Sequence, residues 1–194
     1  EPAAAAFREA QQADPAMTLA YVGEALTYTH QVWNQQDMSR GRAALEKLGA
    51  TATQRLEKAK SPRERTYGEL AEALYGGGSK ASRDTSFTRI AEKLVAANPN
   101  DDEAKMFHAV GLLGLNQSVR EPVAYMKAGA IAEEVLKRNP DHPAAAHFVI
   151  HAYDDPVNAP RGLAAARAYS QIAPAAPHAD RKSTRLNSSH VSES

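Results

Sequence analysis

Cysteine is absent from the 194-residue sequence. Disulfides, thiolate catalysis and cysteine-ligated zinc are therefore excluded. The sequence also lacks net formal charge, with 23 basic and 23 acidic residues and no basic cluster. This balance argues against nucleic acid or an anionic membrane surface as the main partner. The sequence has few aromatic residues, no alternating β-branched stretch, and no apolar run long enough to span a membrane. What remains is an alanine-rich composition typical of an all-α protein.

Common catalytic signatures are missing as well. No dinucleotide-binding glycine motif, phosphate-binding loop, nucleophile elbow or paired-carboxylate pattern occurs in the sequence. The three glycines at 76–78 are not followed, at the required spacing, by the Lys-Ser or Lys-Thr pair that begins the helix after a phosphate-binding loop. The sequence therefore gives no direct indication of an enzyme class.

Proline recurs at the corners between amphipathic, alanine-rich stretches. The intervals are roughly 34 to 42 residues, or about twice that, which is the repeat length of stacked helical hairpins. Proline suits such corners because it ends one helix and fits the first turn of the next. The sequence therefore predicts an α-solenoid of antiparallel helical hairpins. The recurring dipeptides are Asp14-Pro15, Asn98-Pro99, Asn139-Pro140 and Ala173-Pro174.

Apolar periodicity and capping residues place the individual helices. Ser61 and Glu64 flank a proline and form a predicted capping box, in which each side chain satisfies a backbone donor of the other. The clearest break between two predicted helical hairpins is the loop at residues 76–79. Helices are expected at residues 2–13, 16–30, 37–48, 51–60, 62–75, 83–97, 101–115, 121–138, 142–153 and 159–172.

The two ends depart from this pattern. Residues 180–190 contain no alanine and no helical apolar period, and they resemble the in-frame translation of a sequencing adapter. We therefore expect residues 180–194 to be a disordered, artefactual tail. The sequence begins inside an amphipathic helix, so residues 1–179 are expected to be one helical repeat domain that is a fragment at both ends.

Four segments of the sequence carry a family resemblance: AYVGEALTYTHQVW (20–33), NPDHP (139–143), AHFVIHAYDDP (146–156) and APAAPHA (173–179). Together they resemble a family of bacterial tetratricopeptide-repeat-like (TPR-like) proteins. The resemblance implies an all-α scaffold of TPR-like hairpins and, because members commonly carry export signals, a periplasmic or extracytoplasmic location. It implies no settled catalytic activity. The repeats are degenerate, since Lys105 and Ala146 stand where the repeat pattern favours tryptophan.

Histidines near the C-terminal end form one candidate site. His147 and His151 lie four residues apart on a predicted helix, so both project from one face and could share a divalent metal such as zinc. His178 follows at the next corner. Phe148 stands where a zinc protease carries its glutamate base, so no metalloprotease is predicted. Structural, metal-binding and catalytic roles stay open, and His142 is expected to cap a helix.

Residues 21–33 form the second candidate site. Tyr21, Glu24 and Tyr28 align on one stripe of a predicted helix, and His30 and Trp33 follow it. The stripe suits either a core face with the glutamate at its edge or a polar binding site in a concave groove.

These observations predict a scaffold that binds a protein or peptide partner in a concave groove, with the three aromatic residues as anchors. The alternative is a histidine-rich metal or small-molecule site, possibly enzymatic, that needs residues beyond position 179. Neither hypothesis involves nucleic acid or membrane insertion.

Overall fold

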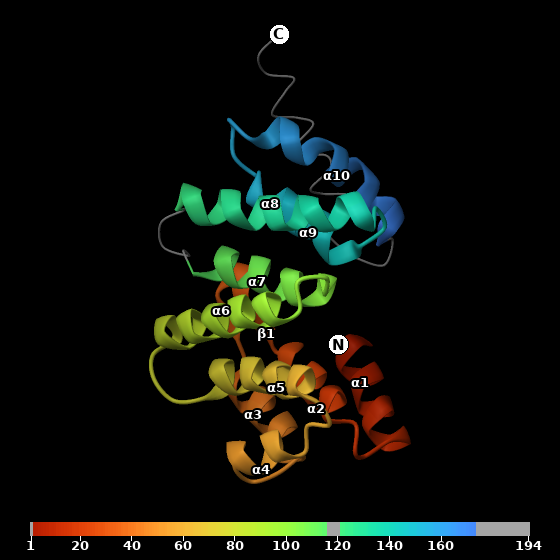
Figure 1. The fold of residues 1–194 in the computed structure, drawn as a ribbon, viewed down its shortest axis with the longest axis vertical. Coiled ribbons are helices and arrows are strands. Elements are labelled where there is room, and N and C mark those ends of the chain that lie inside the picture. Colours follow the sequence, from red (N-terminus) through yellow and green to blue (C-terminus); the bar gives the residue numbers. More distant parts are fainter. Residues whose placement is uncertain (1, 116–120, 174–194) are drawn as a thin grey trace. The chain divides into compact units, whose positions relative to one another are not determined.

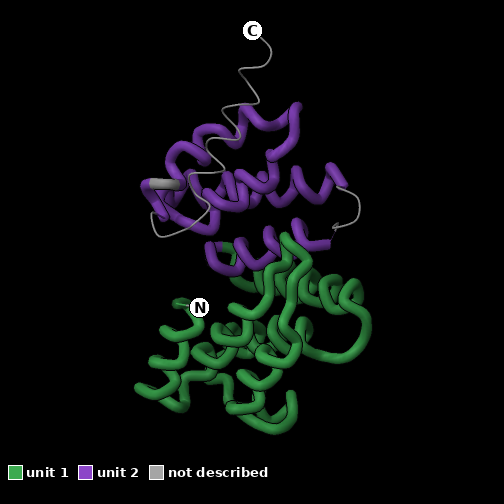
Figure 2. The backbone as a smooth tube through the Cα atoms, turned by 180° about the vertical axis from the view of Figure 1, so that it is seen from behind, with its two compact units in different colours: residues 1–99 green, residues 100–194 purple. Residues whose placement is uncertain are grey.

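The computed structural model describes residues 2–115 and 121–173, and the chain divides into two compact units (Figure 2). Unit 1 is Glu1–Pro99 and unit 2 is Asn100–Ser194. Nearly all regular structure in the described residues is helical, which confirms the all-α class (Figure 1).

Unit 1 is organised around helix α2. This helix packs against α1, α3 and α5, and α5 packs in turn against α6. Its residues Ala20, Val22 and Ala25 are buried, so the centre of the unit is built from small apolar side chains. The helices of unit 1 are α1 (Pro2–Ala13), α2 (Thr18–Leu26), α3 (Met38–Glu46), α4 (Ala52–Glu57), α5 (Pro62–Tyr75) and α6 (Lys80–Ala97).

Unit 2 is a stack of consecutive helices. Helix α7 packs on α8, α8 on α9 and α9 on α10, and α7 also contacts α9. Fully buried alanines, among them Ala128, Ala132, Ala145 and Ala146, let the helix backbones approach closely. This arrangement agrees with the predicted solenoid of packed helices. The helices of unit 2 are α7 (Asp102–Gly114), α8 (Pro122–Arg138), α9 (Pro143–Ala152) and α10 (Ala159–Ile172).

Helix starts follow the capping residues read from the sequence. Ser61 Oγ accepts a hydrogen bond from the backbone N–H of Glu64, as expected for the start of α5. The reciprocal bond differs from the prediction, because the Glu64 carboxylate accepts from the N–H of Lys60, at 2.7 Å, rather than from that of Ser61. The glutamate thus still satisfies a backbone donor, one residue further from the helix.

The predicted helix over residues 16–30 is too long at its C-terminal end. Helix α2 ends at Leu26, and the chain then forms a short hairpin of β1 (Thr29–His30) and β2 (Gln35–Gln36) around the 3₁₀ turn η1 (Gln31–Trp33). Asn34 adopts a left-handed conformation with φ of 55°, which asparagine tolerates better than most residues. The hairpin therefore redirects the chain before α3 begins.

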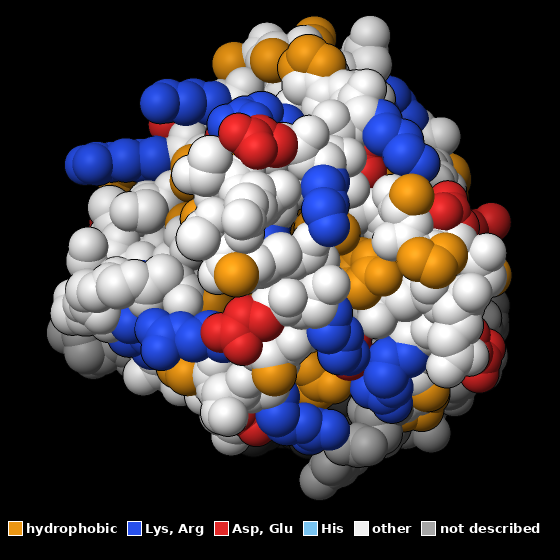
Figure 3. All heavy atoms as spheres, turned by 90° about the horizontal axis from the view of Figure 1, so that it is seen from below, with side chains coloured by type: hydrophobic (Ala, Val, Ile, Leu, Met, Phe, Trp, Pro, Cys, Tyr) orange, Lys and Arg blue, Asp and Glu red, His pale blue; other side chains and the backbone are white. Residues whose placement is uncertain are grey.

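The face shown in Figure 3 carries Lys and Arg side chains interspersed with Asp and Glu, and its hydrophobic side chains lie in separate small areas. Among the helices of the described residues, none combines the length and apolar character needed to cross a membrane.

Candidate functional site

A pocket of about 490 Å³ opens in unit 1 beside the short hairpin. This volume falls within the range of small-molecule and peptide side-chain sites. Its lining combines guanidinium, imidazole, amide, hydroxyl and carboxylate groups. The lining residues are Ala4, Thr27, Tyr28, His30, Gln35, Gln36, Asp37 and Arg40.

Local hydrogen bonds fix the backbone that carries these side chains. The Asp37 N–H donates to the Tyr28 carbonyl at 2.9 Å, which closes the hairpin at its base. The Asp37 carboxylate caps α3 by accepting from the Arg40 N–H at 3.0 Å. Gln36 is held on both sides of its amide: its Nε2 donates to the Leu74 carbonyl, and its Oε1 accepts from Arg83. The hairpin is therefore attached to α3, α5 and α6, and the pocket rests on ordered backbone.

Arg40 lies over the face of the Tyr28 ring, with 4.5 Å between the guanidinium carbon and the ring centroid. At this distance the aromatic face attracts the cation and restricts its position. The Arg40 side chain is exposed, whereas Tyr28 is half-buried. The tyrosine thus orients an exposed positive charge at the pocket.

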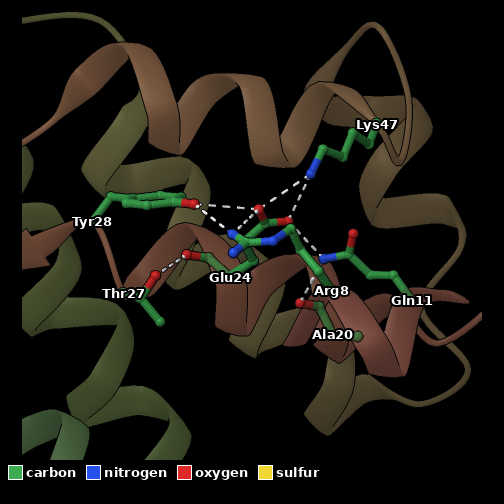
Figure 4. Close-up of polar contacts among 7 residues, drawn as sticks. All are labelled: Arg8, Gln11, Ala20, Glu24, Thr27, Tyr28 and Lys47. Atoms are coloured by element: carbon green, nitrogen blue, oxygen red, sulfur yellow. Dashed lines mark hydrogen bonds and ion pairs between the residues drawn. The ribbon is translucent and has the colours of Figure 1, made fainter. Parts of the chain in front are cut away.

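The Tyr28 hydroxyl contacts a charge cluster around the buried carboxylate of Glu24 (Figure 4). It donates to Glu24 Oε1 at 3.3 Å and accepts from Arg8 Nη1 at 3.2 Å. Lys47 Nζ donates to both carboxylate oxygens of Glu24, at 3.1 and 2.9 Å, and Gln11 Nε2 donates to Oε2 at 2.7 Å. We call these five residues the Glu24 cluster. It joins α1, α2 and the end of α3.

Glu24 is 3% exposed, yet its charge is compensated. Burial alone raises the pKa of the Glu24 carboxyl, but the hydrogen bonds from Gln11 and Lys47, with the Lys47 charge, bring it below its ordinary value. The carboxylate is therefore ionised at neutral pH, and both of its oxygens accept hydrogen bonds from within the protein. This arrangement suits a structural support for Tyr28 better than a proton-transferring group.

The five residues predicted from segment 21–33 take different positions. Tyr28 and His30 line the pocket, and Glu24 lies in the cluster that holds Tyr28. Tyr21 is buried, and its hydroxyl donates to the Pro15 carbonyl at 3.1 Å, so it belongs to the core. Trp33 is 60% exposed on η1 and is not among the pocket-lining residues.

Several pocket residues were missed by the sequence reading. Thr27, Gln35 and Gln36 carry no recognisable motif, and their place depends on the hairpin. Asp37 had a local signal, because an aspartate at the start of the predicted helix at 37–48 is a typical N-cap. That signal locates a helix start, but it does not show that the capping turn borders a pocket.

In unit 2, the structure brings His147 and His151 together on α9. Their Nε2 atoms are 3.0 Å apart, and His147 Nδ1 lies 2.9 Å from the Tyr169 hydroxyl of α10. His142 caps α9 by accepting from the Ala145 N–H, as predicted. The third predicted ligand, His178, lies outside the described residues. Within those residues, no group of three or more His, Asp or Glu side chains is placed to hold a metal.

Comparisons with protein-family models, with curated proteins and with solved structures found no match. The TPR-like resemblance therefore stays a prediction from the sequence.

Proposed function

We propose that the protein is a TPR-like helical scaffold that binds an extended segment of a partner protein in the pocket of unit 1. The observation that carries this proposal is the composition of the pocket: exposed Arg40, His30, Gln35 and Asp37 surround a half-buried Tyr28 ring. A peptide backbone presents both hydrogen-bond donors and acceptors, and this lining offers both kinds of partner.

The charge of the pocket also favours a peptide over a polyanion. Arg40 supplies a positive charge, but Asp37 supplies a negative charge three residues away on the same turn. A site for phosphate groups usually concentrates positive charge, as nucleic-acid interfaces do. The mixed pocket is better suited to a segment with polar side chains of both signs.

Trp33 supports the proposal from outside the pocket. It is the only tryptophan of the sequence, and it stands 60% exposed on the turn between the two strands of the hairpin. Exposed tryptophans are enriched among residues that dominate binding energies at protein interfaces. We infer that a bound segment leaves the pocket across η1 and contacts the indole.

The proposal is tested by selecting short peptides from a displayed random library on the full chain and measuring their affinities by fluorescence anisotropy. We expect Arg40→Ala and His30→Ala each to weaken binding of an enriched peptide about tenfold, or about 1.4 kcal/mol. Trp33→Ala is expected to have a similar effect, also without unfolding the chain, because its side chain is exposed.

Arg89→Ala is the matched control, since it removes an exposed arginine of α6 that does not line the pocket. It should leave peptide affinity unchanged. The proposal is wrong if no peptide is enriched, or if the enriched peptides bind the Arg40→Ala and His30→Ala variants as tightly as the original chain.

A further inference from the structure

Helix α9 places two imidazole nitrogens opposite each other. His147 and His151 are one turn apart, and the Nε2 atoms of the two rings are separated by 3.0 Å. The ring centroids are 4.7 Å apart, with the ring planes tilted by 53°. The same nitrogen of each ring therefore faces the other at hydrogen-bond distance, and neither histidine belongs to the pocket of unit 1.

We propose that His147 and His151 form a two-imidazole chelate for a divalent transition metal of the zinc, nickel and copper group. Zinc binds histidine nitrogen at about 2.0–2.1 Å with tetrahedral angles, which puts two ligand nitrogens about 3.3 Å apart. The observed separation needs only a few tenths of an ångström of widening to admit the ion.

Tyr169 orients one of the two ligands. Its hydroxyl lies 2.9 Å from His147 Nδ1, and its ring meets the imidazole edge-on, with centroids 5.2 Å apart. A second group that holds the distal nitrogen of a ligating histidine is the usual support of such sites. Tyr169 is therefore a positioning residue for His147.

The tautomers of the two rings explain how the pair admits a metal. In the 3.0 Å contact, one Nε2 carries a hydrogen and the other accepts it. A metal needs the lone pairs of both Nε2 atoms, so the protonated ring must move its hydrogen to Nδ1. For His147, the Tyr169 oxygen can accept from Nδ1–H. The change moves one hydrogen within a neutral ring and releases no net proton.

Two protein nitrogens leave coordination positions that water or a small anionic ligand can fill. Catalytic zinc sites use three protein ligands and structural ones four, so this two-imidazole chelate should hold its metal more weakly than either. His151 is buried and His147 is half-buried. This inference concerns unit 2 alone and does not depend on peptide binding by unit 1.

The test titrates the tag-free full chain with zinc chloride and, separately, with copper(II) chloride and magnesium chloride, by isothermal titration calorimetry near neutral pH. We expect one saturable site for zinc, tighter binding for copper, and none for magnesium, following the affinities of nitrogen ligands. His147→Ala and His151→Ala should each weaken zinc binding at least tenfold. Tyr169→Phe should weaken it about tenfold while both imidazoles remain.

Gln171→Ala is the matched control, because it removes an exposed polar side chain of α10 and keeps both imidazoles, so the isotherm should be unchanged. Far-ultraviolet circular dichroism checks that each variant is folded. If either α9 variant fails to fold, nitrogen-15 spectra of the original chain decide: the Nε2 signals of both histidines should shift on adding zinc. The proposal is overturned if the α9 variants bind zinc like the original chain, or if neither Nε2 signal moves.

Discussion

Unit 1 and unit 2 each bury a tyrosine ring against a helix glycine. Tyr75 of α5 faces Gly41 of α3, and Tyr153 at the end of α9 faces Gly129 of α8. A Cβ atom at Gly41 would lie 2.0 Å from the Tyr75 ring, and one at Gly129 would lie 2.5 Å from the Tyr153 ring. In both units, the absent side chain makes room for an aromatic ring, so the steric solution is the same.

The two hydroxyl groups differ. Tyr75 Oη donates to the Ala25 carbonyl of α2 at 2.7 Å, in a buried setting. Tyr153 Oη makes no hydrogen bond of normal geometry within the described residues. Burial and the nearby Glu133 charge raise the pKa of Tyr153 to about 12. A well-packed ring therefore need not have a hydrogen-bonded hydroxyl. Both rings contribute packing, but only the Tyr75 hydroxyl contributes a strong hydrogen bond.

The largest expected effect on stability comes from adding a side chain at the two glycines, where it would overlap the tyrosine rings. Gly41→Ala and Gly129→Ala should each lower the free energy of unfolding by about 2 kcal/mol, because the new methyl group overlaps a buried ring and outweighs the gain in helix propensity. Urea unfolding followed by circular dichroism measures the change.

Gly77→Ala is the control for these substitutions, because a Cβ there meets nothing within 4 Å. It should change stability by less than about 0.5 kcal/mol. If Gly41→Ala and Gly129→Ala were equally neutral, the tyrosine rings would not be packed as described.

Removing the hydroxyl group should have different effects on stability at the two tyrosines. Tyr75→Phe should cost about 1.5 kcal/mol, because it leaves the buried Ala25 carbonyl without this donor. Tyr153→Phe should stay within about 0.5 kcal/mol, since no strong hydrogen bond is lost. Equal losses for the two variants, measured by the same urea unfolding, would remove the distinction between them.

The smallest expected effect is a loss of unfolding free energy at alkaline pH. Burial raises the pKa of the Tyr75 hydroxyl well above its ordinary value of 10.0. The stability that this group contributes is therefore complete below pH 10 and is lost as pH rises, because the unfolded chain ionises first. Near pH 11 the loss should be about 1 kcal/mol per tyrosine.

Tyr75→Phe should accordingly show a shallower decline of unfolding free energy between pH 10 and pH 11 than the original chain does. Parallel declines would mean that Tyr75 does not remain protonated when folded.

Local features of the fold could be predicted from the sequence. His142 caps α9 because the signal lies within three residues of the helix start, and His147 meets His151 because four residues make one helical turn. The end of α2 was missed, since the hairpin depends on contacts of Gln36 with α5 and α6 that local propensity does not report.

The pocket depends on similarly distant partners. Glu24 could be placed on a helix stripe, but its partners Arg8 and Lys47 lie 16 and 23 residues away in the sequence. Without them, the sequence left both a core face and a binding site open. In the structure Glu24 is buried, and Tyr28 both contacts Glu24 and lines the pocket.

We expect the proposed peptide ligand to bind unit 1 at the pocket beside the hairpin. The decisive experiment is a titration of the nitrogen-15-labelled full chain with a selected peptide, followed by backbone amide and indole spectra. Shift changes should be concentrated in residues 27–40, including the Trp33 indole. Shift changes concentrated in α8, α9 and α10, with residues 27–40 unmoved, would contradict this expectation.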